Sequence, residues 1–145
     1  MTKVYFDTNV LVAALKPDHV HHVPCLAAYS DVLLGAIEGY FSSQGLSEFY
    51  SVATRTPFVV PIHPLGAVEI IERSIMPHFH LVDLNAASYR AAISECAKSG
   101  WRGGRVHDAV HIQAAAQAKC DLIYTNDLEH FQSLAPEWGD RIRRP

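Results

Sequence analysis

The sequence has few cysteines, and those it has lie far apart. Cys25, Cys96 and Cys120 form no CxxC pair, and three is an odd number for a chain of 145 residues. Scattered thiols of this kind are typical of reduced, buried side chains and not of a disulfide framework. We therefore expect a cytoplasmic protein whose fold depends on a hydrophobic core.

The sequence also lacks a long hydrophobic run and an excess of positive charge. The early apolar run Val10 to Leu15 is too short to cross a membrane, and Asp7 and Asp18 bracket it, so we expect neither a membrane segment nor a signal peptide. The net charge is −3, which predicts no broad basic face, although an acidic metal site in a nucleic-acid enzyme would give the same balance. With 49% hydrophobic residues and no repeats, residues 1–145 are predicted to form a single domain.

Short β-rich runs alternate with helical runs along the chain. Strands are predicted at 3–6, 40–43, 78–84 and 121–126, with a further strand possible in the tail 140–145. Helices are predicted at 8–15, 18–38 with Asp18 as the cap, 45–54, 64–76, 86–98 with Asp83 or Asn85 as the cap, 105–119 and 128–134. Right-handed crossovers then give a parallel sheet with helices on both faces, whose sites form at the carboxyl ends of the strands.

Four of the 15 acidic residues are poorly explained by surface or turn positions. Asp7 and Asp127 each follow an apolar strand and precede a helix, so helix capping is the alternative explanation for both. Glu48 and Asp108 lie near helix starts, where a favourable interaction with the helix dipole is the alternative. Because the carboxyl ends of parallel strands meet at one crevice, the four together favour a shared site.

The stretch His107 to His111, HDAVH, is close to the zinc-protease pattern HExxH. An aspartate there would shorten the general base by one methylene, and a third ligand would have to come from elsewhere, with His19, His21 and His22 as the obvious candidates. Nine histidines in the chain make chance pairs of this spacing common. A zinc hydrolase is therefore kept as the least favoured alternative.

Four segments, taken in order, resemble the acidic motifs of the PIN-domain ribonucleases, and most closely those of VapC-type toxins. They are YFDTNVL, LSEFYSV, HDAVHIQAAAQA and IYTNDLEHF, together with the approach GWRGGRVHDA and the ending TxDxxxF formed by Thr125, Asp127 and Phe131. The resemblance covers the chain from Lys3 to the tail. It implies a three-layer α/β sandwich with a central, mainly parallel sheet and helices on both faces.

The resemblance implies an endoribonuclease that depends on Mg²⁺ or Mn²⁺ and uses water to leave a 5′-phosphate and a 3′-hydroxyl. Its catalytic residues would be Asp7, Glu48, Asp108 and Asp127. Asp7 and Asp108 are expected to bind metal directly, and Glu48 and Asp127 directly or through water, with Thr125, Thr8 and Asn9 in support. Crowded carboxylates repel one another, which raises some of their pKa values, and a hard divalent cation with oxygen ligands relieves that repulsion.

Cations near the acidic motifs are candidates for contacts to RNA. Arg102 and Arg105 flank two glycines just before Asp108, and either guanidinium could contact a phosphate. The basic tail residues Arg141, Arg143 and Arg144 are a weaker candidate.

The resemblance also implies a cognate antitoxin protein and a toxin homodimer, with no membrane partner. Exposed apolar residues on 18–38 and 46–56, with Phe49 and Tyr50 as examples, are predicted to form the antitoxin surface. A PIN scaffold that binds without catalysing remains the main alternative function.

Overall fold

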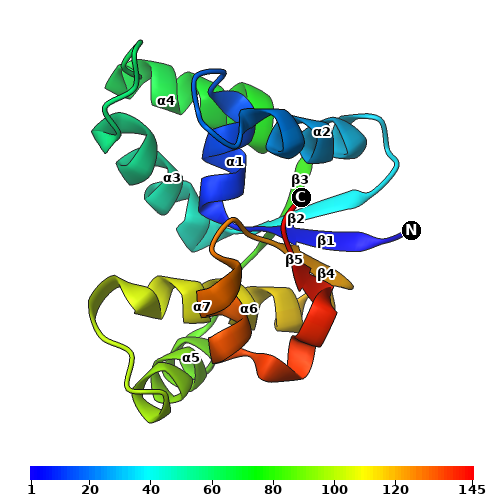
Figure 1. Ribbon diagram of the computed structural model, residues 1–145, viewed down its shortest axis with the longest axis vertical. Helices are drawn as coiled ribbons and strands as arrows, with labels where there is room; N and C mark the ends of the chain where they lie inside the picture. Colours follow the sequence, from blue (N-terminus) through cyan, green and yellow to red (C-terminus); the bar gives the residue numbers. More distant parts are fainter.

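A five-stranded parallel sheet in the order β3-β2-β1-β4-β5 divides the molecule into two layers of helices (Figure 1). The computed structural model describes residues 1–145. The strands are β1 (Lys3–Phe6), β2 (Glu38–Ser42), β3 (Phe79–Val82), β4 (Leu122–Tyr124) and β5 (Ile142–Arg143). Every neighbouring pair of strands is parallel, so the predicted α/β fold is confirmed, and the sheet is parallel throughout.

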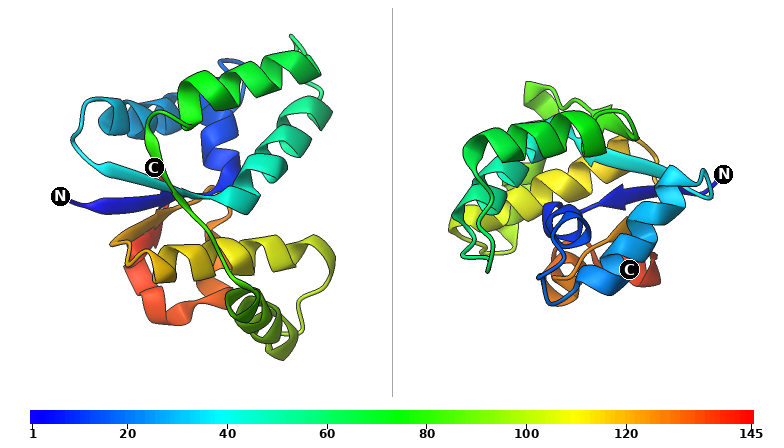
Figure 2. Two further views of the ribbon diagram at one scale, coloured as in Figure 1. Left: turned by 180° about the vertical axis from the view of Figure 1, so that it is seen from behind. Right: turned by 90° about the horizontal axis from the view of Figure 1, so that it is seen from above.

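The helices segregate by position along the chain, as the front and rear views show (Figures 1 and 2). One layer holds α1 (Thr8–Leu15), α2 (His22–Leu33), α3 (Ser43–Arg55) and α4 (Pro64–Ile70), which continues into a π-helical turn at Ile71–Ile75. The other holds α5 (Ala86–Lys98), α6 (Val106–Gln117) and α7 (Leu128–Leu134). Short 3₁₀ turns lie at Gly103–Arg105 and Pro136–Arg141. No helix is both long and apolar enough to span a bilayer.

Alternation along β1 separates the two hydrophobic cores. Val4 and Phe6 belong to a cluster of 16 buried residues shared with α1, α2 and α3. Tyr5 belongs to a second cluster of 10 buried residues that includes Ala114 of α6 and Phe131 of α7. Successive side chains of a strand point to opposite faces, so β1 contributes to the core of both layers.

The strand order reverses at β1, and this places a crevice at its carboxyl end. The chain moves from β1 through β2 to β3 on one side and then returns to place β4 on the other side of β1. Residues that follow β1 and β4 therefore lie side by side, with α1 leaving into one layer and α7 into the other. Such a switch point is where open parallel sheets form their sites.

The predicted helix 18–38 is wrong at both ends. Residues 17–20 form a turn, α2 begins at His22, and the Asp18 carboxylate accepts a hydrogen bond from the Val59 backbone N–H at 2.8 Å, so it does not cap the helix. The helix ends at Leu33, and Gly35 adopts a φ of 73°, a left-handed conformation that commonly follows a helix end.

The remaining differences concern boundaries. The predicted strands 78–84 and 121–126 are shorter, and β2 begins at Glu38 and ends at Ser42, whose side chain caps α3. Between the two caps suggested for α5, the structure selects Asn85, whose Oδ1 accepts a hydrogen bond from the Ser88 N–H at 2.9 Å.

Candidate active site

The four predicted acids reach one edge of the sheet from four different elements. Asp7 follows β1, Asp127 follows β4, Glu48 comes from α3 and Asp108 from the first turn of α6. Two groups of possible metal ligands result: Asp7 and Glu48 with His111, and Asp108 and Asp127 with His130. Within each group, the ligand atoms lie within 4.8 Å of one another.

Ordinary helix chemistry does not account for three of these acids. Asp7 and Asp127 occupy the N-cap positions of α1 and α7, yet neither side chain makes a capping hydrogen bond. Because α3 begins at Ser43, Glu48 lies in its second turn. A favourable interaction with the helix dipole is confined to the first turn and does not explain Glu48. For Asp108 the favourable position in the first turn of α6 remains a partial explanation.

Thr125 links the acids that follow the two central strands. Its buried hydroxyl donates a hydrogen bond to Oδ2 of Asp7 at 2.9 Å and accepts one from the backbone N–H of Asp127, also at 2.9 Å. Thr125, which was predicted to support the site, thus contacts the carboxylate of Asp7 and the backbone of Asp127. Asn9 is exposed beside the same edge, and Thr8 is buried below it.

His111 lies within the acidic site, in one of the two groups of possible metal ligands. Its Nε2 lies 3.1 Å from Oγ1 of Thr8, 3.3 Å from Oε1 of Glu48 and 3.7 Å from Oδ1 of Asp7. Its Nδ1 forms a hydrogen bond of 2.6 Å with the hydroxyl of Tyr5. Tyr5 was not predicted as a site residue. It lies two residues before Asp7, so their side chains point to the same face of the sheet, and this spacing could have indicated it.

A second imidazole borders the more exposed acids. Nδ1 of His130 donates to Oδ2 of Asp127 at 2.7 Å, and its ring meets the Trp101 ring edge-on with centroids 5.6 Å apart. The Arg105 guanidinium stacks over Trp101 at 4.8 Å, and its NH1 group has no hydrogen-bond partner. Arg102 is exposed. The two predicted phosphate contacts thus differ, since only Arg105 packs beside the site.

Burial and charge divide the four carboxyl groups. Burial, reinforced by the charges of Asp7, Asp127 and Glu48, raises the pKa of Asp108 from 3.8 to about 7. Burial also raises the pKa of Asp7.

His111 accounts for the opposite shift at Glu48. Burial opposes the charged form of both side chains, but their mutual hydrogen bond and opposite charges outweigh it. The pKa of Glu48 is therefore lowered and that of His111 is raised. Without a cation, the ionised form is thus favoured at Glu48 and disfavoured at Asp7 and Asp108.

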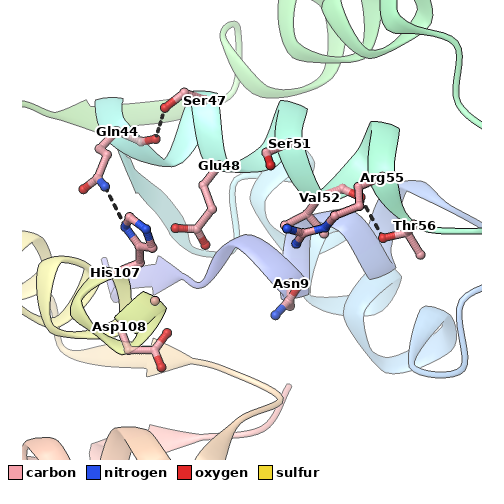
Figure 3. Close-up of a pocket in the computed structure, with 11 residues that line it drawn as sticks. Asn9, Gln44, Ser47, Glu48, Ser51, Val52, Arg55, Thr56, His107 and Asp108 are labelled. Carbon is pink, nitrogen blue, oxygen red and sulfur yellow. Dashed lines mark hydrogen bonds between the residues drawn. The ribbon is translucent and has the colours of Figure 1, made fainter. Parts of the chain in front are cut away.

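A polar groove of about 670 Å³ runs along α3, and two of the four acids, Glu48 and Asp108, line it (Figure 3). Glu48 and Asp108 face each other across it, and Nε2 of Gln44 contacts Nδ1 of His107 at 2.9 Å. One of the eleven lining residues is hydrophobic, and the lining residues are Asn9, Gln44, Ser47, Glu48, Ser51, Val52, Arg55, Thr56, Gly104, His107 and Asp108. A groove of this polarity suits a hydrated, polar chain better than an apolar ligand.

The structure gives no support to a zinc site built on HDAVH. His107 faces Gln44 and does not belong to either group of possible metal ligands, whereas His111 points inward to Glu48. Two of the three suggested third ligands, His19 and His21, line an adjoining hollow of about 420 Å³ together with Asn9 and Asp127, on the other side of the acids from His107, and neither belongs to a group of possible metal ligands. His22 bonds to the carbonyl oxygen of Ala13. The tetrahedral set that a zincin requires is therefore not assembled.

The chain belongs to the PIN domain family, whose sequence model matches residues 4–135. This confirms the family suggested by the acidic motifs. A search of curated protein sequences finds no significant match.

Solved structures of toxin proteins share the fold. Mycobacterium tuberculosis VapC20, described as a toxin that cleaves the sarcin–ricin loop, aligns with a TM-score of 0.69 at 15% identity over 88% of this chain and 92% of its own. FitAcB from Neisseria gonorrhoeae aligns with a TM-score of 0.66 at 20% identity over 98% and 96%. VapBC2 from Rickettsia felis, bound to a DNA fragment from its promoter, gives 0.63 at 15% identity over 99% and 98%. The fold is thus that of VapC-type PIN domains.

Proposed function

We propose that residues 1–145 act as a single PIN domain that hydrolyses RNA phosphodiester bonds with Mg²⁺ or Mn²⁺. The observation that carries this proposal is the convergence of Asp7, Glu48, Asp108 and Asp127 at one edge of the sheet. Their crowding is severe enough that burial and neighbouring charge raise the pKa of Asp108 to about 7. A carboxyl group in a structural ion pair has a lowered pKa, whereas that of Asp108 is raised, so this arrangement favours a cation-binding site.

The donor chemistry of the residues fits a hard divalent ion. Asp7 and Glu48 offer carboxylate oxygens on the buried side, and Asp108 and Asp127 offer them on the more exposed side. Oxygen ligands of this kind are preferred by Mg²⁺ and Mn²⁺. When bound, such an ion would lower the pKa of a water molecule and stabilise negative charge on phosphoryl oxygens.

The chain's own residues would orient the acids and hold the substrate. Thr125 fixes one oxygen of Asp7 by its 2.9 Å hydrogen bond, which leaves the other oxygen of that carboxylate for a ligand. The groove along α3 would take the RNA strand, with Arg55 as a cation for a phosphate and Ser47 and Ser51 as hydroxyl donors. Arg105 beside Asp108 is a further candidate for a phosphate contact.

We also propose that the protein is a cytoplasmic toxin with a cognate antitoxin and that it forms a homodimer. The solved VapBC2 and FitAcB structures share its fold, and VapBC2 was determined on promoter DNA. Exposed apolar side chains on α2 and α3 support an antitoxin surface; they include Val23, Leu26 and Leu33 of α2 and Tyr50 of α3. Phe49, suggested beside Tyr50, is only 1% exposed and belongs to the core, so it is removed from that surface.

RNA cleavage by the purified protein tests the proposal. Single-stranded RNA would be incubated with Mn²⁺ or Mg²⁺, and an Asp7→Asn variant, which keeps the shape of the side chain but removes its charge, would serve as the matched control. We expect metal-dependent cleavage by the parent and a loss of at least about a hundredfold in the variant, because a ligand is removed. Equal cleavage by both proteins, or none by the parent, would refute the nuclease assignment. RNA binding without cleavage would favour the non-catalytic alternative.

A further inference from the structure

His111 occupies a position where an apolar side chain would be expected. It lies on the buried face of α6 beside Val110, Ala114 and Ala115, is 1% exposed, and stacks on the ring of Phe41 with centroids 6.1 Å apart. Burying an imidazole there is unfavourable unless both ring nitrogens have partners. Both do, and the partners come from β1, α1 and α3.

The partners determine where the imidazole carries its proton. Nε2 faces carboxylate oxygens of Glu48 and Asp7, which accept hydrogen bonds when ionised, so Nε2 must be the donor. In the neutral ring, Nδ1 is then the acceptor, and the Tyr5 hydroxyl at 2.6 Å is the group that can donate to it. Tyr5 thus orients the ring and, while the ring is neutral, selects the tautomer that donates to Glu48. In the protonated ring Nε2 still donates to Glu48, and Nδ1 donates to the Tyr5 hydroxyl oxygen.

The contact also joins the two helix layers. His111 belongs to α6 on one side of the sheet, whereas Thr8 of α1 and Glu48 of α3 belong to the layer on the other side. The Glu48 side chain is partly exposed at 22% and would be free to adopt other rotamers without this bond. A single buried donor therefore holds the acid from α3 beside Asp7.

We propose that His111 is a positioning residue whose Nε2–H, set by the Tyr5 hydroxyl, fixes Glu48 beside Asp7 for metal binding. This inference rests on the proposed nuclease function. Although His111 lies within reach of the same ion as Asp7 and Glu48, we assign it to positioning, because Nδ1 is bonded to Tyr5, Nε2 donates to Glu48, and a hard ion prefers the carboxylate oxygens. Replacing a group that orients a metal ligand in this way commonly lowers metal affinity or activity 10- to 100-fold.

Three substitutions of His111 and one of Tyr5 separate positioning from simple packing. His111→Gln can place an amide N–H near the position of Nε2, His111→Asn reaches only about as far as Nδ1, and His111→Leu fills the space without a donor. Tyr5→Phe removes the hydroxyl that sets the ring and leaves His111 in place. His78→Gln is the matched control, since His78 is exposed just before β3, at the opposite edge of the sheet. Thermal unfolding would confirm that each variant is folded, and calorimetry would give the affinity for Mn²⁺.

We expect His111→Leu and His111→Asn to lose about 10- to 100-fold in Mn²⁺ affinity, with His111→Gln close to the parent and Tyr5→Phe intermediate. RNA turnover should fall in kcat with little change in KM. Equal Mn²⁺ affinity in His111→Leu and the parent, or losses that follow thermal stability and not the presence of a donor, would overturn the positioning role. If any His111 variant fails to fold, Tyr5→Phe with unchanged affinity and kcat gives the same refutation. A parent protein that neither binds Mn²⁺ nor cleaves RNA would refute the nuclease assignment as well.

Discussion

The hydroxyl of Thr125 and the carboxylate of Asp7 form a buried hydrogen bond of 2.9 Å across 118 positions of sequence. The bond exists because β1 and β4 are neighbours and parallel, so the residues just beyond their carboxyl ends meet. It stabilises the ionised form of Asp7 against the burial that raises its pKa. One hydroxyl therefore connects the strand order to the charge state of the site.

Thr125→Val should weaken the site while keeping its shape. The substitution removes the hydroxyl that donates to Asp7. It also removes the acceptor for the backbone N–H of Asp127, which is left without a partner. We expect about a tenfold loss in Mn²⁺ affinity and a decrease of about 1–2 kcal/mol in the free energy of unfolding. Calorimetric titration and urea unfolding would measure the two effects.

Thr125→Ser retains the hydroxyl and should recover most of the affinity. Thr54→Val is a control for loss of a threonine hydroxyl, because Thr54 bonds to the Tyr50 carbonyl within α3 and does not line the groove. If Thr54→Val and Thr125→Val lowered metal affinity equally, the special role of the Thr125–Asp7 bond would be disproved.

Metal binding should depend on pH through Asp108. Its pKa is raised to about 7, mainly by burial and then by the charge of Asp7, so the carboxyl group holds a proton below that value. A metal ion displaces this proton, so apparent Mn²⁺ affinity should fall by up to about tenfold per pH unit as the pH decreases below about 7. Titrations in buffers of different ionisation enthalpy would also detect the released proton. An affinity independent of pH between 6 and 8 would contradict the assignment.

The same carboxyl group should destabilise the metal-free fold at neutral pH. Its pKa of about 7 in the folded state exceeds the ordinary value of 3.8, which applies to the unfolded chain. Between these two values the folded state therefore holds more protons than the unfolded state, and stability falls as pH rises through that window. Asp108→Asn removes the penalty and should increase the free energy of unfolding at pH 7.5 by about 1–3 kcal/mol without metal. At pH 4 the gain should largely disappear. Denaturant unfolding at the two pH values measures the change in the free energy of unfolding. If Asp108→Asn were less stable than the parent at pH 7.5, the raised pKa of Asp108 would be contradicted.

The meeting of acids at one edge of the sheet could be anticipated from the sequence because it follows from parallel strands. Asp7 and Asp127 each come after an apolar strand, and parallel strands bring their carboxyl ends to one edge. The sequence did not predict which non-acidic side chains would complete the site. His111 seemed one of many histidines, and its contacts with Tyr5 and Glu48 depend on how α6 and α3 pack around the sheet edge.

The bounds of the helix predicted at 18–38 were less accurate than the alternation of strands and helices, for a local physical reason. Asp18 is a favourable cap in isolation, but the Val59 N–H is available to it in the folded chain, and the helix starts at His22. A cap residue has competing partners that lie far away in sequence, whereas hydrophobic alternation in β1 is decided by the strand itself.

Gly45 provides a test of how α3 is seated. A Cβ at this position would collide with the ring of Phe41, so the absence of a side chain allows the helix that carries Glu48 to approach β2 closely. Gly45→Ala should therefore reduce the free energy of unfolding by about 1–3 kcal/mol, even though alanine favours helix formation. Gly66→Ala in α4, where the nearest neighbour of the added Cβ would be Cγ2 of Ile62 at 4.0 Å, should instead be neutral or stabilising. Thermal and denaturant unfolding of the pair measures the contrast, and a stabilised Gly45→Ala would contradict the close approach.

Arg55 should contribute to RNA binding and not to the chemical step. It is the one lysine or arginine among the residues that line the groove, and it lies at the end of α3, away from Glu48 and Asp108 (Figure 3). Arg55→Gln should raise KM for RNA about three- to tenfold with kcat nearly unchanged, because a phosphate contact holds substrate before and during reaction alike. A plot of log affinity against log salt concentration should also become less steep by about 0.7, the value for one phosphate contact to single-stranded nucleic acid.

Arg90→Gln is the matched control for that experiment, because Arg90 is exposed on α5 in the other helix layer. Arg55 also lies in the last turn of α3, where a positive charge stabilises the helix by about 0.3–1 kcal/mol, so unfolding must be measured alongside binding. A change in KM and in the salt slope for Arg55→Gln alone would place the RNA strand along α3. If Arg90→Gln gave the same changes, the effect would reflect net charge, and RNA would have to approach the four acids from another side of the sheet edge.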